Sequence, residues 1–214
     1  MPCLKPAAGP RSRDYRHAVK NRILLPANGQ SSGIVNFCSE CGERVETRVP
    51  EGDSRPRDVC PACGTIHYEN PRIVAGCVVT YGDEVLLCKR AIEPRSGFWT
   101  VPAGFMELGE TMAEAAARET LEEACARIEP GALFSIVDVV HARQVHVFFE
   151  AALETLEFGA GEETEAAAMY PLDAIPWKEL AFPSVRIALQ RYLENRAAGV
   201  TALHLDTAPR IRVS

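Results

Sequence analysis

The segment from Gly104 to Ala126 constrains the chain most, because it joins a glycine-bearing loop to a stretch crowded with carboxylates. Thr111 followed three residues later by Glu114 is the pattern of a capping box, so we expect a helix to begin there. Apolar residues that recur at helical spacing predict one packed stripe on this helix. Its members are Ala117, Leu121 and Ala124.

Three acidic side chains share the opposite face of the expected helix, because they stand at positions i, i+3 and i+4. They are Glu119, Glu122 and Glu123. Like charges at this spacing destabilise a helix by about 0.2–0.5 kcal/mol per pair. A solvated acidic face is the ordinary interpretation, whereas a hard divalent cation would turn the repulsion into coordination by oxygen ligands. The crowding of three carboxylates after a glycine-bearing loop favours a metal site.

The loop and the helix together resemble the Nudix box. Gly104 is followed after five intervening residues by Glu110, and after seven more by the pair Arg118-Glu119. Two further residues separate this pair from Glu122-Glu123. Two positions depart from the family pattern, which usually has an aliphatic residue at Thr120 and a glycine at Cys125. Because glycine is preferred where φ is positive, Cys125 leaves the geometry of the helix end open.

The resemblance implies both a fold and a chemistry. Nudix proteins are α/β/α sandwiches with a mixed sheet, and Nudix hydrolases cleave nucleoside diphosphates linked to another group, using Mg²⁺ or Mn²⁺. By this resemblance, the metal ligands are the carbonyl of Gly104 and the carboxylates of Glu119, Glu122 and Glu123. Arg118 would orient these carboxylates through charge-assisted hydrogen bonds, and Glu110 would brace the loop.

The group that deprotonates the attacking water stays open at this point. By the same resemblance it is either Glu123 or a carboxylate of the polar stretch 154–165, whose ordinary interpretation is a solvated loop. The candidates there are Glu162, Glu163 and Glu165. The expected catalytic group is Glu123, Glu119, Arg118 and Glu163.

Two Cys-x-x-Cys pairs, eighteen residues apart, define a second module over residues 37–70. Their members are Cys38, Cys41, Cys60 and Cys63. This is the spacing of a four-thiolate zinc ribbon, and with all four ligands supplied by the protein the Zn²⁺ would be structural. So short a segment depends on the metal to fold, because it has little core of its own. The alternative is a redox-active pair of dithiols.

The remaining pattern is that of an α/β domain over residues 71–198. Alternating or continuous apolar runs predict strands at 73–81, 84–89, 133–140, 144–152 and 167–172, and helical spacing predicts a closing helix at 184–196. Residues 1–36, with six basic residues and one acidic residue, are expected to form a disordered basic tail. An organelle-targeting peptide is the alternative for this segment. Residues 199–214 are expected to be a second tail.

Charge and composition limit the partners. The net charge of −6 predicts no general nucleic-acid-binding surface, and no apolar run is long enough to span a membrane. The start of the chain lacks the apolar core of a secretion signal, so a cytoplasmic location is expected. The partner implied by the resemblance is a small nucleotide substrate, and many relatives in the family form homodimers.

A zinc ribbon before a Nudix box narrows the expected substrate. The combination resembles FAD and ADP-ribose diphosphatases, and also NADH diphosphatases. The NADH enzymes usually carry a Ser-Gln-Pro motif after the box, which residues 134–140 lack. The residues expected to bind substrate are Arg90, Trp99 and Tyr68. A function of another class, a non-catalytic nucleotide-sensing or nucleic-acid-binding module, is the remaining alternative.

Overall fold

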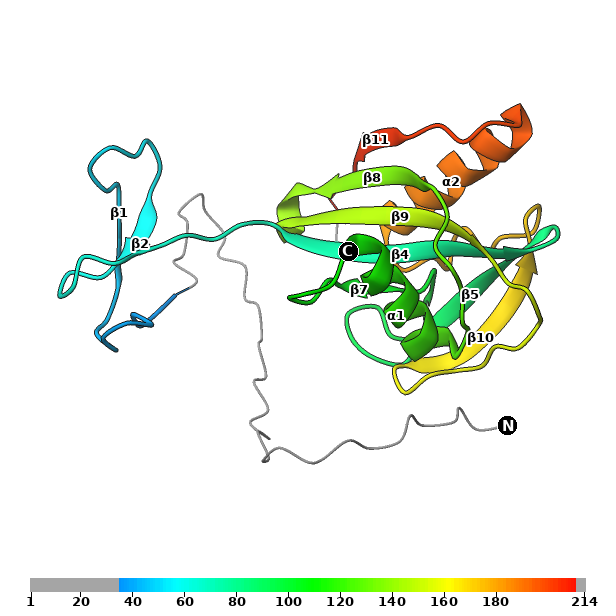
Figure 1. Ribbon diagram of the computed structural model, residues 1–214, viewed down its shortest axis with the longest axis horizontal. Coiled ribbons are helices and arrows are strands. Elements are labelled where there is room, and N and C mark those ends of the chain that lie inside the picture. The colour runs from blue at the N-terminus through cyan, green and yellow to red at the C-terminus, as the bar shows by residue number, and fades with distance from the viewer. Residues whose placement is uncertain (1–34, 211–214) are drawn as a thin grey trace. The chain divides into compact units, whose positions relative to one another are not determined.

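The computed structural model of the chain describes residues 35–210 (Figure 1). These residues belong to two compact units, with the boundary between Asn70 and Pro71. The tail expected over residues 1–36 lies outside the described residues except for its last two positions. Within residues 35–210, no helix combines the length and the apolar character that a membrane span requires.

The smaller unit is a three-stranded antiparallel sheet in the order β1-β2-β3. Its strands are β1 (Glu46–Arg48), β2 (Arg57–Val59) and β3 (Ile66–His67). Two tight turns hold the Cys-x-x-Cys pairs: Gly42 N donates to the Cys38 carbonyl and Gly64 N to the Cys60 carbonyl, both at 2.9 Å. The two turns therefore repeat one backbone geometry around two pairs of thiols.

The larger unit contains an eight-stranded mixed sheet, whose main path runs β10-β5-β4-β9-β8-β11. The pairs β4·β9 and β8·β11 are parallel and the other pairs are antiparallel. The strands are β4 (Arg72–Tyr81), β5 (Glu84–Arg90), β6 (Trp99–Thr100), β7 (Ala103–Phe105), β8 (Leu133–Val139), β9 (Gln144–Ala152), β10 (Thr164–Pro171) and β11 (His204–Thr207). A 3-10 turn, η1 (Val140–Ala142), joins β8 to β9.

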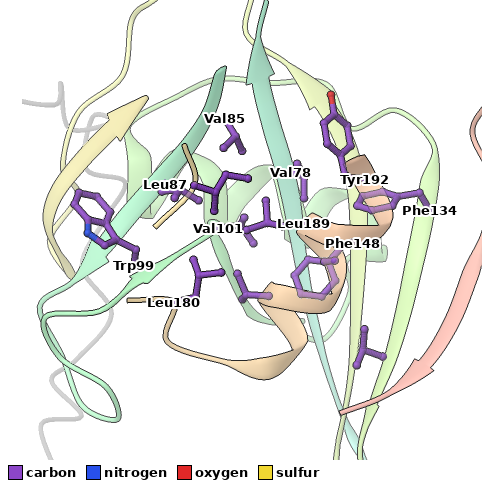
Figure 2. Close-up of a cluster of buried hydrophobic side chains, with 14 of the residues drawn as sticks. Val78, Val85, Leu87, Trp99, Val101, Phe134, Phe148, Leu180, Leu189 and Tyr192 are labelled. Atoms are coloured by element: carbon purple, nitrogen blue, oxygen red, sulfur yellow. The ribbon is translucent and has the colours of Figure 1, made fainter. Parts of the chain in front are cut away.

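One helix covers each face of this sheet: α1 (Met112–Ala124) and α2 (Pro183–Ala198) (Figure 1). Because successive side chains of a strand point to opposite faces, β4 supplies Val78 to the core under α2 and Cys77 and Val79 to the core under α1. Figure 2 shows the core on the α2 side, where Val78, Phe134 and Phe148 meet Leu189. This arrangement confirms the expected α/β/α sandwich with a mixed sheet.

Helix α1 begins as its sequence predicts. The Thr111 hydroxyl accepts from Glu114 N at 3.2 Å, and the Glu114 carboxylate accepts from Thr111 N at 2.7 Å, which is a complete capping box. The helix ends at Cys125, whose φ of 50° is the left-handed geometry for which glycine is usual. The cysteine therefore occupies a glycine-type position without changing how the helix terminates.

The expected apolar stripe of α1 is wrong at two of its three positions. Ala117 and Leu121 are only half-buried, whereas Thr120 and Glu123 face the sheet and are buried. Thr120 can be buried because its hydroxyl donates to the Ala116 carbonyl at 2.8 Å. The helix thus turns one acidic residue of the box away from solvent.

The tail expected over residues 199–214 contains an ordered strand. Residues 204–207 form β11, which pairs in parallel with β8 at the edge of the sheet. Arg191 of α2 binds Asp206 through two hydrogen bonds of 2.9 and 2.7 Å, and His204 contacts Asn195 at 2.8 Å. These contacts with α2 order a segment that is too short and too polar to be recognised as a strand from its sequence.

Candidate active site and metal centres

The backbone of β7 lies directly against helix α1. Pairing of β7 with β4 sets Gly104 opposite Ala75 and presents its Cα to Glu119. A Cβ at Gly104 would lie only 2.3–2.4 Å from the carboxylate atoms of Glu119. Only a glycine lets the carboxylate and the backbone of the loop come this close.

Arg118 connects the loop with the acidic residues of the helix. Its guanidinium donates to both carboxylate oxygens of Glu110 at 3.1 and 2.8 Å, and to the Phe105 carbonyl at 3.0 Å. It also donates to Glu119 at 2.7 Å and to Glu122 at 3.2 Å. The hydrogen bonds from Arg118 hold the pKa of Glu110 below its usual range. The guanidinium of Arg118 therefore holds the loop and two of the three helix carboxylates in place.

Glu123 is the buried carboxylate of the site, with only 9% of its surface exposed. One of its oxygens accepts from Ala103 N at 3.0 Å. Burial raises the pKa of Glu123 to about 7, with the Glu119 and Glu163 charges adding to the effect; the Ala103 hydrogen bond and Arg90 oppose it. The pKa of Glu119 is raised as well, first by burial and then by Glu122 and Glu163, against Arg118.

One of the three candidate carboxylates around the start of β10 acts electrostatically on this cluster. Glu163 is the residue whose charge acts on both Glu119 and Glu123, and its carbonyl accepts from Ala91 N at 2.9 Å. Glu165 instead forms an ion pair with Lys89 at 3.3 Å. Glu162 and Glu163 are both exposed. Glu163 therefore differs from its neighbours in its charge interaction with Glu119 and Glu123, and not in burial.

The donor set suits a hard divalent cation. It offers carboxylate and carbonyl oxygens, which Mg²⁺ and Mn²⁺ prefer, and its mutual repulsion would be relieved by positive charge. The three helix carboxylates are not gathered around one point, because Glu119 and Glu122 contact Arg118 whereas Glu123 contacts Ala103 N. Among residues 35–210, the four cysteines form the one group of three or more metal-binding side chains within 4.8 Å of one another.

The four thiols of the smaller unit suit a tetrahedral zinc ion. The Sγ–Sγ distances are 3.6 Å for Cys38–Cys63 and 3.5 Å for both Cys41–Cys60 and Cys41–Cys63. A tetrahedron with Zn–S bonds of about 2.3 Å has edges of about 3.8 Å. The thiols therefore stand close to the positions that a structural Zn²⁺ would require.

The three residues expected to bind substrate lie in different surroundings. Arg90 is near enough for its charge to act on Glu123, and its guanidinium stacks over the Phe182 ring at 5.2 Å. Trp99 is 8% exposed and packs edge-on against Tyr170 in the core, so its ring is not free to stack on a base. Tyr68 belongs to the smaller unit, where it is exposed and lies under Arg57.

Two backbone groups at the site carry no signal in the sequence. Ala103 N binds the buried Glu123 carboxylate, and the Phe105 carbonyl binds Arg118. Every residue except proline has such an N–H group and every residue has a carbonyl, so residue type cannot reveal which of them meet a functional side chain. Only the pairing of β7 with β4 decides it.

Replacing Gly104 by alanine is expected to lower kcat/KM of the pyrophosphate hydrolysis that the Nudix box implies by about 100-fold. The reason is that the new methyl group would displace the Glu119 carboxylate. The fold should survive, since a carboxylate at the end of a side chain can swing away; a loss of under about 1 kcal/mol is expected in urea unfolding. Gly159→Ala, where the Cβ meets nothing closer than 4.0 Å, is the matched control. Unchanged activity of the Gly104 variant would contradict the close approach.

The buried Glu123 makes the metal-free protein sensitive to pH. The pKa of Glu123 in the folded protein is about 7, above the ordinary 4.5, so the folded state binds the proton more tightly than the unfolded state. The resulting contribution to the free energy of unfolding is fully present below pH 4.5 and is lost as the pH rises through 7. The loss amounts to about 3 kcal/mol. In EDTA, Glu123→Gln should therefore melt several degrees above the unmodified protein at pH 8, with little difference at pH 4.5. Equal melting temperatures at pH 8 would show that the carboxylate is not penalised by burial.

Family models match both units of the chain. The Nudix N-terminal model matches residues 36–69 and the NUDIX domain model matches residues 70–191. The NAD-capped RNA hydrolase NudC of Stutzerimonas stutzeri is 30% identical over 170 residues, which are 75% of this chain and 56% of that protein. NudC of Vibrio cholerae is 36% identical over 97 residues, covering 44% and 34% of the two chains. The chain thus spans about half or less of the length of these relatives.

Solved structures agree with the family models. A NUDIX hydrolase from Nitrosomonas europaea is 46% identical, with a TM-score of 0.79 over 82% of this chain and 100% of that chain. A MutT NUDIX hydrolase from Burkholderia pseudomallei is 28% identical, with a TM-score of 0.50 over 57% and 98% of the two chains. The match of the NUDIX domain to more than half of the sequence, on a sandwich whose loop and helix carry the full set of box carboxylates, shows that the chain belongs to the Nudix hydrolase family.

Proposed function

We propose that this chain is a divalent-metal-dependent diphosphatase. It would hydrolyse the pyrophosphate bond of a nucleoside diphosphate linked to another group. The observation that carries the proposal is the buried Glu123 beside Glu119, on a helix whose Arg118 is bound to the glycine-bearing loop. Burying an ionisable carboxylate costs stability, so its presence here is expected to serve a reaction.

Gly104, Glu119, Glu122 and Glu123 would hold Mg²⁺ or Mn²⁺ in this proposal. Bound there, the cation would neutralise phosphate oxygens and acidify a water molecule. Arg118 keeps Glu119 and Glu122 oriented and ties them to the loop, so the carboxylates need not reorganise when the ion and substrate arrive. In this proposal the guanidinium of Arg90, whose charge acts on Glu123, would bind a phosphate of the substrate.

Two carboxylates could take the proton of the attacking water. A general base works best when its pKa lies near the working pH, and Glu123 has a pKa of about 7 before any metal binds. A cation on Glu123 would lower that pKa and make it a ligand rather than a base. Glu163 belongs to another segment and its charge acts on Glu123, so in this proposal Glu163 would serve as the base while Glu123 serves the metal.

The substrate class follows from the pyrophosphate chemistry and from the relatives. We propose a dinucleotide-type substrate, with FAD and ADP-ribose first and NADH as the alternative. The names of the relatives, NAD-capped RNA hydrolases, suggest a further candidate substrate, a dinucleotide joined to RNA. Although the net charge of −6 argues against a general nucleic-acid surface, a capped RNA needs recognition only at its end. NAD-capped RNA therefore belongs among the substrates to be tested, and the homodimer remains a prediction.

A substrate panel tests the proposal. FAD, ADP-ribose, NADH and NAD-capped RNA are incubated with Mg²⁺ or Mn²⁺, and AMP or the released RNA 5′-phosphate is quantified beside Glu123→Gln. Cleavage by the unmodified protein alone, abolished by EDTA and restored by the cation, is the expected result. If neither protein cleaved any of the four substrates, the enzyme hypothesis would be overturned and a nucleotide-binding module would be favoured. Calorimetry with the same four ligands would then measure their binding.

A further inference from the structure

The loop at residues 158–163 rests on the C-terminal end of helix α1. Gly159 N donates to the Ala124 carbonyl at 2.8 Å, and Gly161 N donates to the Glu123 carbonyl at 3.0 Å. The last carbonyls of a helix have no partner within the helix, so the loop satisfies two of them. The segment that follows β9 is thereby fastened to the helix that carries the acidic cluster.

Gly161 makes the tighter of these two approaches. A Cβ at Gly161 would lie 1.7 Å from the Glu122 carbonyl oxygen and 2.8 Å from its carbon, both backbone atoms. A Cβ at Gly159 would meet only the Cβ of Cys125, at 4.0 Å, which is an ordinary contact. The two glycines thus make similar hydrogen bonds, but only Gly161 requires the absence of a side chain.

Any group added at Gly161 would displace the loop rather than the helix. Helix α1 is fixed on the sheet by Ala115, Ala116 and Ala124, none of which is exposed to solvent. The Glu123 carbonyl also accepts from the buried Cys88 thiol of β5 at 3.8 Å. The loop is packed less fully, because only Phe158 at its start lies against the core under α1, whereas Ala160 and Glu162 are exposed to solvent.

Glu163 follows Gly161 by two residues and is held from two sides. Thr164 N donates to the Gly161 carbonyl at 3.2 Å, and Ala91 N donates to the Glu163 carbonyl at 2.9 Å. Between these contacts Glu163 stands two residues from Gly161, whose N–H binds the Glu123 carbonyl, so the backbone of Glu163 is held beside the end of the helix that carries the cluster. In agreement with this position, the charge of Glu163 acts on Glu119 and on Glu123. A shift of the loop at Gly161 would therefore move Glu163 relative to the cluster.

We propose that Gly161 is a positioning residue for the reaction: by lacking a side chain it seats the loop on the end of α1 and so places the Glu163 carboxylate at the acidic cluster. This inference rests on the proposed diphosphatase function and deepens it by assigning the placement of the second carboxylate to one backbone contact. A misplacement of about 1 Å in a reacting group costs about 100-fold in rate. Gly161→Ala should therefore affect kcat far more than KM.

The test is a double-mutant cycle in the full-length protein with Mg²⁺, on the panel substrate that the unmodified protein cleaves fastest. Gly161→Ala should lower kcat between about 10- and 100-fold with KM within about threefold, and Gly159→Ala should stay within about twofold. In the Glu163→Gln background the Gly161 substitution should have little further effect, because it acts through Glu163. Exchange of the Ala91 amide, followed by NMR, should be faster in Gly161→Ala only.

If Gly161 had a purely structural role, Gly161→Ala would lower kcat by the same factor with Glu163 present and with Glu163→Gln, and this result would overturn the proposal. Unchanged activity of Gly161→Ala, or of Glu163→Gln, would also overturn it. If Gly161→Ala does not fold, Ala91→Pro removes the other contact of Glu163 without touching α1, and the same dependence on Glu163 is expected. Inertness of the unmodified protein on the whole panel would refute the diphosphatase instead. The exchange rate of the Ala91 amide would then still show whether Gly161 seats the loop.

Discussion

Glu123→Gln is expected to abolish hydrolysis, with kcat lowered by about 10²- to 10⁴-fold. Glutamine has the same shape and its amide oxygen can still accept from Ala103 N, so the position of the side chain is kept. What is lost is the negative charge that a divalent cation would require at this point. The variant should therefore lose activity while it keeps the folded structure.

The measurement is AMP release from the fastest panel substrate, with Mn²⁺ affinity of both proteins determined by calorimetry. Glu129→Gln makes the same chemical change at an exposed position beyond the end of α1 and should retain full activity. Circular dichroism should show both variants folded. If Glu123→Gln kept more than about a tenth of the activity, Glu123 would not be an essential ligand or base. The metal would then have to rest on Glu119 and Glu122.

Removal of zinc is expected to unfold the smaller unit and leave the larger one folded. Zinc binding to such sites supplies about 10–16 kcal/mol of apparent free energy, whereas three strands of two or three residues bury little apolar surface. Cys60, with no exposed surface, lies at the centre of this unit. Cys60→Ser should therefore lose the metal and protection from amide exchange over residues 35–70.

Metal analysis of protein purified without chelator should give about one zinc per chain, and Cys60→Ser should give far less. Cys88→Ala removes a buried thiol from the core of the larger unit and should leave the zinc content unchanged. Well under one zinc per chain in the unmodified protein, together with disulfides in the Cys-x-x-Cys pairs, would instead support the redox-active dithiols. Retained protection over residues 35–70 in Cys60→Ser would show that the unit folds without metal.

The contrast between Glu119, Glu122 and Glu123 shows how far the helix pattern could be used. Their spacing correctly places all three on neighbouring positions, because helix geometry fixes i, i+3 and i+4 locally. It could not tell that Glu123 is buried at the sheet while more than half of the Glu122 side chain is exposed. That difference depends on how α1 is rotated about its axis against β4 and β7. The apolar stripe that includes Leu121 predicts a different rotation, which is wrong because Leu121 is only half-buried.

The expected substrate contacts illustrate the same limit. The expectation for Arg90, Trp99 and Tyr68 rests on residue type, and type alone does not separate an aromatic ring in the core from one on the surface. The charge of Arg90 acts on Glu123 of the cluster, whereas the Trp99 ring is buried against Tyr170. Residues 204–207 show the converse case, in which a polar segment becomes a strand because β8 and α2 are there to bind it.

Local sequence patterns encode the chemical groups that this protein can offer: two pairs of thiols, a capped helix, and an arginine among carboxylates after a glycine. Each of these follows from spacing within a few turns of the chain. Which carboxylate is buried, the close approach of Gly104 to Glu119, and the contact of Gly161 with the end of α1 depend on the three-dimensional packing. These contacts join residues far apart in sequence, and their geometry is set by strand register and packing, which no local pattern encodes.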